Sequence, residues 1–234
     1  MLKILALGNS FSQDCTAHLE SMTSGAYVRN LYIGGCSLER HAGNLNNKIA
    51  DYTLQKDGHA LYNACVNAND VIASTPWDIV TVQQVSGLSG VYDSHYPYLT
   101  AVLKHIRALC PTAKIVWNQT WAYASDSTHG DFPIYGRDQK KMFSMIDEVS
   151  RRVADENGLE RIEVGRAIQA LRERLAPDGT ELCRDGFHLS FDYGRYAAAY
   201  VWAKFFALPV NNAYLPDGAD AQRIEQIRRI CDAL

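Results

Sequence analysis

Concentrated positive charge is missing from this sequence of 234 residues, in which 23 Lys and Arg are balanced by 26 Asp and Glu to give a net charge of −3. No stretch of consecutive Lys or Arg is longer than a pair. A protein that binds nucleic acid through phosphate contacts needs a cationic face or stripe. We therefore expect no nucleic acid among its main partners.

Long apolar runs are missing from the N-terminal end as well. The run Ile4-Leu5-Ala6-Leu7 is short, whereas a signal-peptide core needs roughly 7–15 apolar residues and a membrane-spanning helix roughly 20. The sequence as given predicts a cytoplasmic protein with no membrane partner. A leader already removed from the chain would leave no trace in it.

The sequence also lacks the spacings typical of metal sites and disulfide-rich scaffolds. It has no CxxC pair and no close Cys/His cluster, and its acidic and His residues show no ligand spacing. We therefore predict no metal and no cofactor. The cysteines are interpreted as small thiols that are buried or half-buried: Cys15, Cys36, Cys65, Cys110, Cys183 and Cys231.

Short apolar runs alternate with segments of helical spacing in what the length predicts to be a single domain, residues 1–234. Buried strands are predicted at residues 2–7, 27–33, 79–82 and 114–117, with a weaker strand at 161–164. Strands that are apolar on both faces and alternate with helices pair in parallel and are covered on both sides. The predicted fold is an α/β fold, a three-layer α/β/α sandwich with a central parallel sheet.

Two further elements are predicted outside this pattern. The Lys56-Asp57-Gly58 turn, within residues 51–67, favours a small hairpin on the rim of the sheet. The C-terminal segment has Ile224, Ile227 and Ile230 at helical spacing, which predicts a helix that packs on the sheet.

Parallel sheets bind ligands at the carboxyl ends of their strands, and the first predicted strand is followed directly by Gly8-Asn9-Ser10-Phe11-Ser12. A Ser on a tight strand-to-helix turn is exposed, and the helix N-terminus behind it stabilises developing negative charge. Ser10 is therefore a candidate nucleophile. The alternative is that Ser10 or Ser12 only caps the helix, since Ser is a favoured N-cap residue.

Two other loops at the same edge offer hydrogen-bond donors for an oxyanion hole. Gly34 and Gly35 follow the second strand, and glycines let backbone N–H groups approach a ligand closely. Gln83 and Gln84 follow the third strand with side-chain amide donors. Both observations have a structural alternative, because glycines fit any turn and amides also tie loops together.

A fourth loop carries Asp185 and His188, three residues apart on a turn. At this spacing the carboxylate can accept the imidazole Nδ1–H, which fixes the tautomer and leaves Nε2 free as a base. Taken alone, a loop histidine is usually a solvated side chain. The four loops are expected to meet at one edge of the sheet, so together they predict a catalytic site.

These motifs resemble those of the SGNH/GDSL hydrolase superfamily, whose members carry a nucleophilic Ser after the first strand and a DxxH motif near the C-terminus. Gly8-Asn9-Ser10-Phe11-Ser12 is similar to the first motif, Gly35 to the oxyanion glycine of the second block, and Asp185 with His188 to the DxxH motif. The resemblance implies a flavodoxin-like sandwich and a serine esterase with Ser10, His188 and Asp185 as its triad.

The third block departs from the family, which usually presents an Asn that donates to the oxyanion. This sequence has Val85 at that position, after Gln83 and Gln84. A similar Gln-containing block occurs in some carbohydrate O-acetylesterases of the superfamily. The resemblance therefore implies Gln83 or Gln84 as the replacement donor, alongside the N–H groups of Ser10 and Gly35.

The predicted substrate is a short acyl ester, with acetyl favoured, on a carbohydrate. Trp121 and Tyr123 lie beside amides in the loop after the fourth strand, and aromatic faces next to hydrogen-bonding groups suit sugar rings. His41 is a further candidate for the cleft wall. The alternative is that Trp117 and Trp121 pack in the core or rim and that His41 lies on the surface.

Two other functions stay open. A lipase-like or thioester hydrolase of the same superfamily would act on other acyl groups, although no long apolar loop predicts an acyl tunnel. A glycan-binding protein that keeps the fold without catalysis would explain the altered third block. The sequence predicts no oligomeric state.

Overall fold

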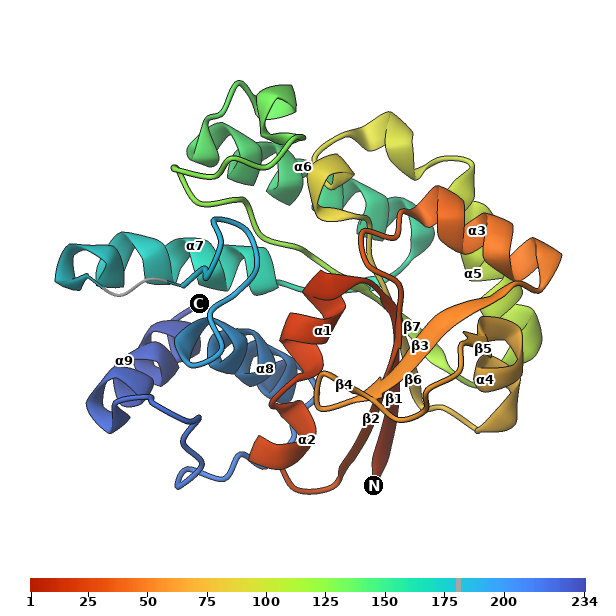
Figure 1. Cartoon of the computed structure of the whole chain (residues 1–234), viewed down its shortest axis with the longest axis horizontal. Coiled ribbons are helices and arrows are strands. Elements are labelled where there is room, and N and C mark those ends of the chain that lie inside the picture. The colour runs from red at the N-terminus through yellow and green to blue at the C-terminus, as the bar shows by residue number, and fades with distance from the viewer. Residues whose placement is uncertain (180–181) are drawn as a thin grey trace.

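The structure, a computed structural model, describes residues 1–179 and 182–234. Figure 1 shows a central sheet with helices on both sides. Its parallel strands run in the order β2-β1-β6-β7-β8. The bounds are β1 (Leu2–Gly8), β2 (Ala26–Tyr32), β6 (Ile79–Val82), β7 (Lys114–Asn118) and β8 (Glu160–Ile162). The predicted central parallel sheet is confirmed.

The order of the strands switches direction at β1. The chain moves outward from β1 to β2, and later returns to place β6 on the other side of β1. At such a switch point the loops that follow neighbouring strands diverge and leave a crevice at the carboxyl ends. The loops after β1, β2 and β6 therefore meet where a ligand site is expected.

Antiparallel strands extend the sheet beyond β2. β3 (Ala50–Lys56) pairs with β2, and both β4 (His59–Ala60) and β5 (Val66–Asn67) pair with β3. Asp57 and Gly58 form the turn between β3 and β4 with φ angles of 50° and 79°. This left-handed conformation is typical of a tight hairpin turn, and the hairpin predicted on the rim is confirmed.

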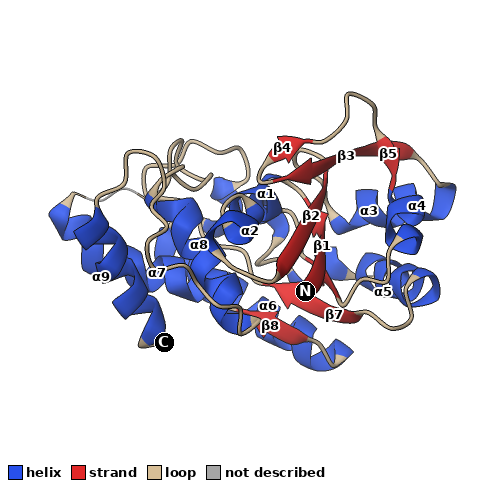
Figure 2. Cartoon of the chain, turned by 90° about the horizontal axis from the view of Figure 1, so that it is seen from below, coloured by secondary structure: helices blue, strands red, loops and turns tan. Residues whose placement is uncertain are grey.

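Helices cover both faces of the sheet, which confirms the three-layer sandwich (Figure 2). One face is covered by α3 (Leu38–Asn47), α4 (Ala68–Ser74) and α5 (Tyr98–Leu109). The other face carries α1 (Ser10–Thr16), α2 (Leu19–Met22), α7 (Val164–Leu175) and α8 (Tyr193–Phe205), and α9 (Ala221–Asp232) lies against α7 and α8. The long helix α6 (Gln139–Asn157) contacts β8 at the edge of the sheet. Short 3₁₀ helices occupy the loops: η1 (Ser86–Leu88), η2 (Tyr92–His95), η3 (Phe132–Tyr135) and η4 (Ala176–Asp178).

The alternation of side chains along β1 divides the core into two clusters. Ile4 and Ala6 pack on the side of α1 and α8, whereas Leu5 and Leu7 pack on the side of α3 and α5. All four are at most 1% exposed, and full burial of a Leu or Ile side chain stabilises a fold by about 1.5–3 kcal/mol. Because both clusters include β1, the strand that leads to Ser10 is held rigidly.

The C-terminal helix α9 packs on other helices, whereas the sequence predicted that it packs on the sheet. α9 forms as predicted and buries Ile224 and Ile227, but it packs on α7 and α8 (Figure 2). The predicted packing on the sheet was wrong because α8 lies between α9 and the sheet. Within the described residues, no helix is both long enough and apolar enough to cross a membrane.

Candidate active site

Ser10 is the first residue of α1, directly after the β1 strand. The N-cap is Asn9, whose side-chain oxygen accepts the backbone N–H of Phe11 at 3.0 Å. The hydroxyl of Ser12 is buried and lies 2.8 Å from both the Asn9 carbonyl oxygen and Asn30 Oδ1. Neither serine therefore caps the helix, and the Ser10 hydroxyl has no capping role.

A cleft of about 210 Å³ opens beside Ser10 at the carboxyl edge of the sheet. It brings together Ser10, Gly35 and His188, which three separate motifs predicted as site residues. The residues that line the cleft are Asn9, Ser10, Tyr32, Gly34, Gly35, Val85, Ser86, His129, Phe187 and His188.

Asp185 holds both the ring and the main chain of His188. Asp185 Oδ2 lies 2.7 Å from His188 Nδ1, while Oδ1 accepts the backbone N–H of His188 at 2.8 Å and that of Phe187 at 3.2 Å. Burial raises the pKa of Asp185, but hydrogen bonds from His188 outweigh burial, so the pKa lies below its usual value. The carboxylate stays ionised, which favours the tautomer with the proton on Nδ1 and leaves Nε2 as the basic nitrogen.

Ser10 and His188 share the cleft without a direct hydrogen bond between their side chains in this structure. Catalytic hydrogen bonds are often long in the absence of substrate and tighten when the complex forms. In the part of the chain that the structure describes, no three His, Cys, Asp or Glu side chains gather into a candidate metal site.

The loop after β2 presents its backbone to the cleft. Gly35 has a φ angle of 62°, a left-handed conformation that glycine adopts without strain. Asn9 Nδ2 donates to the Cys36 carbonyl at 3.0 Å, which fixes this loop against the start of α1. Ser10 and Gly35 both line the cleft, and the backbone N–H of neither residue donates to an acceptor in the described residues.

A family model described as "Domain of unknown function (DUF4886)" matches residues 3–232. The chain belongs to the DUF4886 family. A crystal structure of a DUF4886 family protein from Bacteroides uniformis is 34% identical over 99% of this chain and 93% of that chain, with a TM-score of 0.86. No curated protein matches the sequence.

More distant structures identify the fold of this DUF4886 protein. A proposed SGNH hydrolase from Slackia heliotrinireducens is 23% identical and covers 88% of this chain and 98% of its own, with a TM-score of 0.61. An acetyl xylan esterase is 14% identical with the same coverage and a TM-score of 0.55. The chain has the fold of the SGNH hydrolases, as the motif resemblance predicted.

The two glutamines predicted as oxyanion donors are engaged elsewhere. Gln83 Nε2 donates to Asn9 Oδ1 at 2.9 Å, and Gln83 Oε1 accepts from Asn118 Nδ2 at 2.8 Å. Gln84 Nε2 donates to the Ser94 carbonyl at 2.9 Å. Both side chains are at most 2% exposed and neither lines the cleft. The structure therefore favours the alternative in which these amides tie loops together.

Ser86 lies at the cleft where the β6 loop approaches Ser10 and Gly35. Its hydroxyl is 2.9 Å from the Tyr123 hydroxyl. Burial raises the pKa of Tyr123, so the phenol stays protonated and can donate to Ser86. When Tyr123 is the donor, the Ser86 hydroxyl can donate its own proton to a group in the cleft. Ser86 was not predicted as a site residue, because the side-chain amides of Gln83 and Gln84 are the stronger hydrogen-bond donors in the sequence of this loop.

The three residues predicted to contact substrate are buried and do not line the cleft. Trp121 and Tyr123 have no exposed surface, and His41 is 1% exposed. Trp121 stacks on Phe11 with ring centroids 4.0 Å apart, and its indole N–H donates to the Phe187 carbonyl at 2.8 Å. Trp121 therefore supports the turn that carries His188, and the packing alternative is the correct one for Trp121. Tyr123 packs in the same core and, contrary to the prediction, does not line the cleft.

His41 lies below the Gly35 loop. Its Nδ1 is 3.0 Å from the Tyr52 hydroxyl and 3.5 Å from Cys36 Sγ. Burial, assisted by the nearby Arg40 charge, lowers the pKa of His41 to about 3. The ring is neutral and internal, so both the cleft-wall and the surface interpretation of His41 are wrong.

The aromatic wall of the cleft is made by residues that the sequence reading did not single out. Tyr32 is the last residue of β2, and Phe187 lies between Asp185 and His188. His129 contacts the Phe187 ring with centroids 4.7 Å apart. The position of Tyr32 at a strand's carboxyl end was a usable signal, whereas His129 lies in a long loop whose path the sequence does not predict.

Proposed function

We propose that this DUF4886 protein is a serine ester hydrolase that removes a short acyl group, acetyl, from a carbohydrate ester. One observation carries the proposal: Ser10, Gly35 and His188 line a single cleft, and His188 Nδ1 lies 2.7 Å from Asp185 Oδ2. An alcohol, a base and an orienting carboxylate are the parts that acyl transfer to water needs.

In the proposed reaction, Ser10 Oγ attacks the ester carbonyl carbon and its proton passes to His188 Nε2. The tetrahedral intermediate collapses, and the leaving alcohol takes the proton from His188. Water, deprotonated by the same nitrogen, then attacks the acyl group on Ser10. The second tetrahedral intermediate collapses as the Ser10 Oγ–acyl bond breaks and Oγ takes the proton back from His188, which releases the free acid and regenerates the serine. Asp185 stays ionised throughout and stabilises the imidazolium.

The oxyanion of the intermediate needs donors that are already in place. The N–H groups of Ser10 and Gly35 supply two of them. The Ser86 hydroxyl is the third donor in our proposal, in the role that an Asn amide has in the wider superfamily. The Ser86 hydroxyl lies 2.9 Å from the Tyr123 hydroxyl, and we propose that Tyr123 is the donor in this pair, which directs the Ser86 proton toward the cleft.

The small size of the cleft supports a short acyl group. Its volume of about 210 Å³ lies below the roughly 300–1,000 Å³ of typical small-molecule pockets. Tyr32, Val85 and Phe187 provide apolar surface for a methyl group. Aromatic faces beside the polar Ser86 and His129 support a sugar as the alcohol part, and the same fold occurs in an acetyl xylan esterase.

A panel of nitrophenyl esters tests the acyl preference. We expect the highest kcat/KM for acetate and a decline with each longer chain. Activity that grows beyond butyrate would favour a lipase-like enzyme in place of an acetylesterase. Release of acetate from acetylated oligosaccharides, compared with acetylated simple alcohols, tests the carbohydrate part of the proposal.

A further inference from the structure

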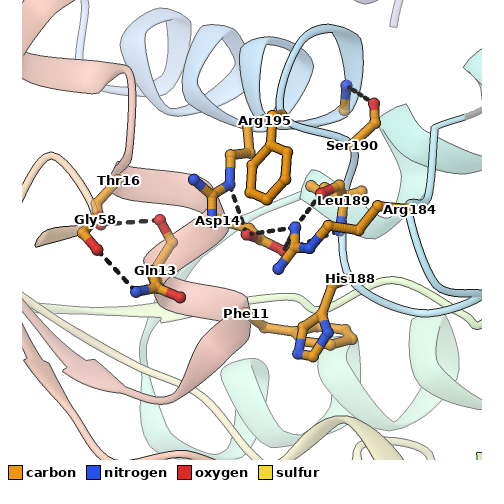
Figure 3. A network of polar contacts seen from close by, with 12 residues as sticks. Phe11, Gln13, Asp14, Thr16, Gly58, Arg184, His188, Leu189, Ser190 and Arg195 are labelled. Carbon is orange, nitrogen blue, oxygen red and sulfur yellow. Dashed lines mark hydrogen bonds and ion pairs between the residues drawn. The ribbon is translucent and has the colours of Figure 1, made fainter.

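We propose that Asp14 is a positioning residue that fixes the turn carrying Asp185 and His188 against the helix carrying Ser10. This inference rests on the proposed function for its catalytic consequence. Asp14 lies on α1, one helical turn after Ser10, and has no exposed surface. Figure 3 shows its carboxylate between the side chains of Arg184 and Arg195, with the His188 ring close to Phe11 on the same helix.

The Asp14 carboxylate contacts both ends of the catalytic turn. Asp14 Oδ2 accepts the backbone N–H of Leu189, the residue after His188, at 2.8 Å. Asp14 Oδ1 accepts from Arg184, the residue before Asp185, at 3.1 Å (Figure 3). One side chain on the nucleophile's helix therefore holds the residues that flank both other members of the triad.

The turn itself is a narrow hairpin, so holding its ends positions its tip. The Arg184 N–H donates to the His188 carbonyl at 2.9 Å, and the Ser190 N–H donates to the Leu182 carbonyl at 2.8 Å. Cys183 and Leu189 form an isolated β-bridge. A shift of this hairpin along α1 moves the His188 ring relative to the Ser10 hydroxyl, which lies on a different element.

A fully buried carboxylate is stable only when it is paired and hydrogen-bonded. Arg195 Nε donates to Asp14 Oδ1 at 2.8 Å, so two guanidinium groups and one backbone N–H share the two oxygens. The Phe191 ring lies 4.7 Å from the Arg184 guanidinium and 4.6 Å from that of Arg195. The cluster occupies the interface between α1 and the start of α8, and none of its members lines the cleft.

The test is Asp14→Asn, which keeps the shape of the side chain and one acceptor oxygen but removes the charge shared by the arginines. We expect kcat on nitrophenyl acetate to fall about 10–10²-fold, because small misplacements of catalytic groups have effects of this size. KM should change by less than about twofold, since Asp14 does not touch the cleft. Hydrogen exchange of peptides spanning the turn should become faster.

Glu20→Gln is the matched control. Glu20 on α2 accepts the Val28 N–H at 2.8 Å and Arg29 at 3.1 Å, and it pairs with Lys56 at 3.0 Å. Glu20→Gln therefore weakens contacts with one backbone N–H and two cationic side chains, as Asp14→Asn does, but at a site away from the catalytic turn. We expect unchanged kcat and unchanged exchange in the turn, with a smaller fall in Tm than for Asp14→Asn because the Glu20 side chain is 19% exposed. If Asp14→Asn does not fold, Arg195→Gln removes one partner of the carboxylate and serves the same test.

The outcomes separate this inference from the proposed function. Full kcat in the folded Asp14→Asn variant, or a turn that exchanges no faster than in Glu20→Gln, overturns the positioning role. A folded wild-type chain that hydrolyses no ester and does not react with a phosphonate overturns the proposed function, and the exchange measurement still decides whether Asp14 holds the turn.

Discussion

His188 Nδ1 lies 2.7 Å from Asp185 Oδ2, while the backbone N–H of His188 donates to Asp185 Oδ1 at 2.8 Å. One carboxylate thus orients the imidazole and closes the turn that carries it. Replacement by an amide affects these two functions differently, because an amide oxygen still accepts the backbone N–H but an amide NH₂ opposes Nδ1–H.

Asp185→Asn should therefore stay folded and lose activity. The amide favours the wrong imidazole tautomer, and we expect kcat to fall about 10²–10⁴-fold. Steady-state kinetics on nitrophenyl acetate check this value. The pKa of Asp185 lies below its usual value, so Asp185 stays ionised above about pH 5. If the activity of the wild-type protein falls as the pH is lowered toward about pH 5, the titration of another group is the cause. An unchanged kcat in the variant would remove Asp185 from the mechanism.

Ser86→Ala should lower kcat about 10²-fold with little change in KM, because loss of one oxyanion donor acts on the transition state. Ser89→Ala is the matched control, since Ser89 is equally buried in the same loop but donates to the Val85 carbonyl at 2.9 Å. Tyr123→Phe should lower kcat less than Ser86→Ala does. Equal activity in the Ser86 and Ser89 variants would show that Ser86 is not an oxyanion donor, and the N–H groups of Ser10 and Gly35 would be the two donors that remain.

Trp121→Phe should lower kcat and leave KM unchanged, because the lost N–H bond supports the Phe187 carbonyl beneath the catalytic turn. Trp117→Phe is the control. Its indole N–H is also buried and donates to Ser150 Oγ at 3.0 Å, away from the turn. A rise in KM for acetylated sugars with kcat unchanged would return Trp121 to the role of a substrate contact.

His41 should make the folded protein sensitive to acid. Its pKa is lowered to about 3 by burial, whereas an unfolded histidine has a pKa of about 6.5. Between these two pH values the unfolded chain binds one more proton at His41 than the folded chain does. The free energy of unfolding therefore falls as the pH falls, by up to about 1.4 kcal/mol per pH unit. Urea denaturation from about pH 7 to about pH 4 should show a shallower pH dependence for His41→Gln, and the exposed His59→Gln should match the wild type.

Much of the fold could be predicted because the parallel strands are short apolar runs with both faces buried. The predicted strand at 79–82 matches β6, and the strand at 27–33 is displaced from β2 by one residue. The last strand ends at Ile162, two residues early, because Val164 already begins α7. Local apolarity alone does not distinguish a strand end from a helix start.

The site could be predicted where function requires a residue at a fixed point of the chain. Ser10, Gly35 and His188 follow strands or precede a helix, and the topology brings them to one cleft. The predictions for Trp121 and His41 were wrong because the sequence does not tell which polar or aromatic side chains are covered by segments distant in the chain. Phe11 and the Phe187 turn cover Trp121, and both lie far from it in the sequence.

The most direct test of the account is covalent labelling by a fluorophosphonate, with the modified residue located by mass spectrometry. We predict a single adduct on Ser10 in the wild type, slower labelling in His188→Ala and none in Ser10→Ala. Because Asn9 caps the helix, Ser10→Ala should keep its stability within about 0.5 kcal/mol. A folded wild-type protein that stays unlabelled, or a Ser10→Ala variant that is labelled at the wild-type rate, would contradict the assignment of Ser10 as the nucleophile.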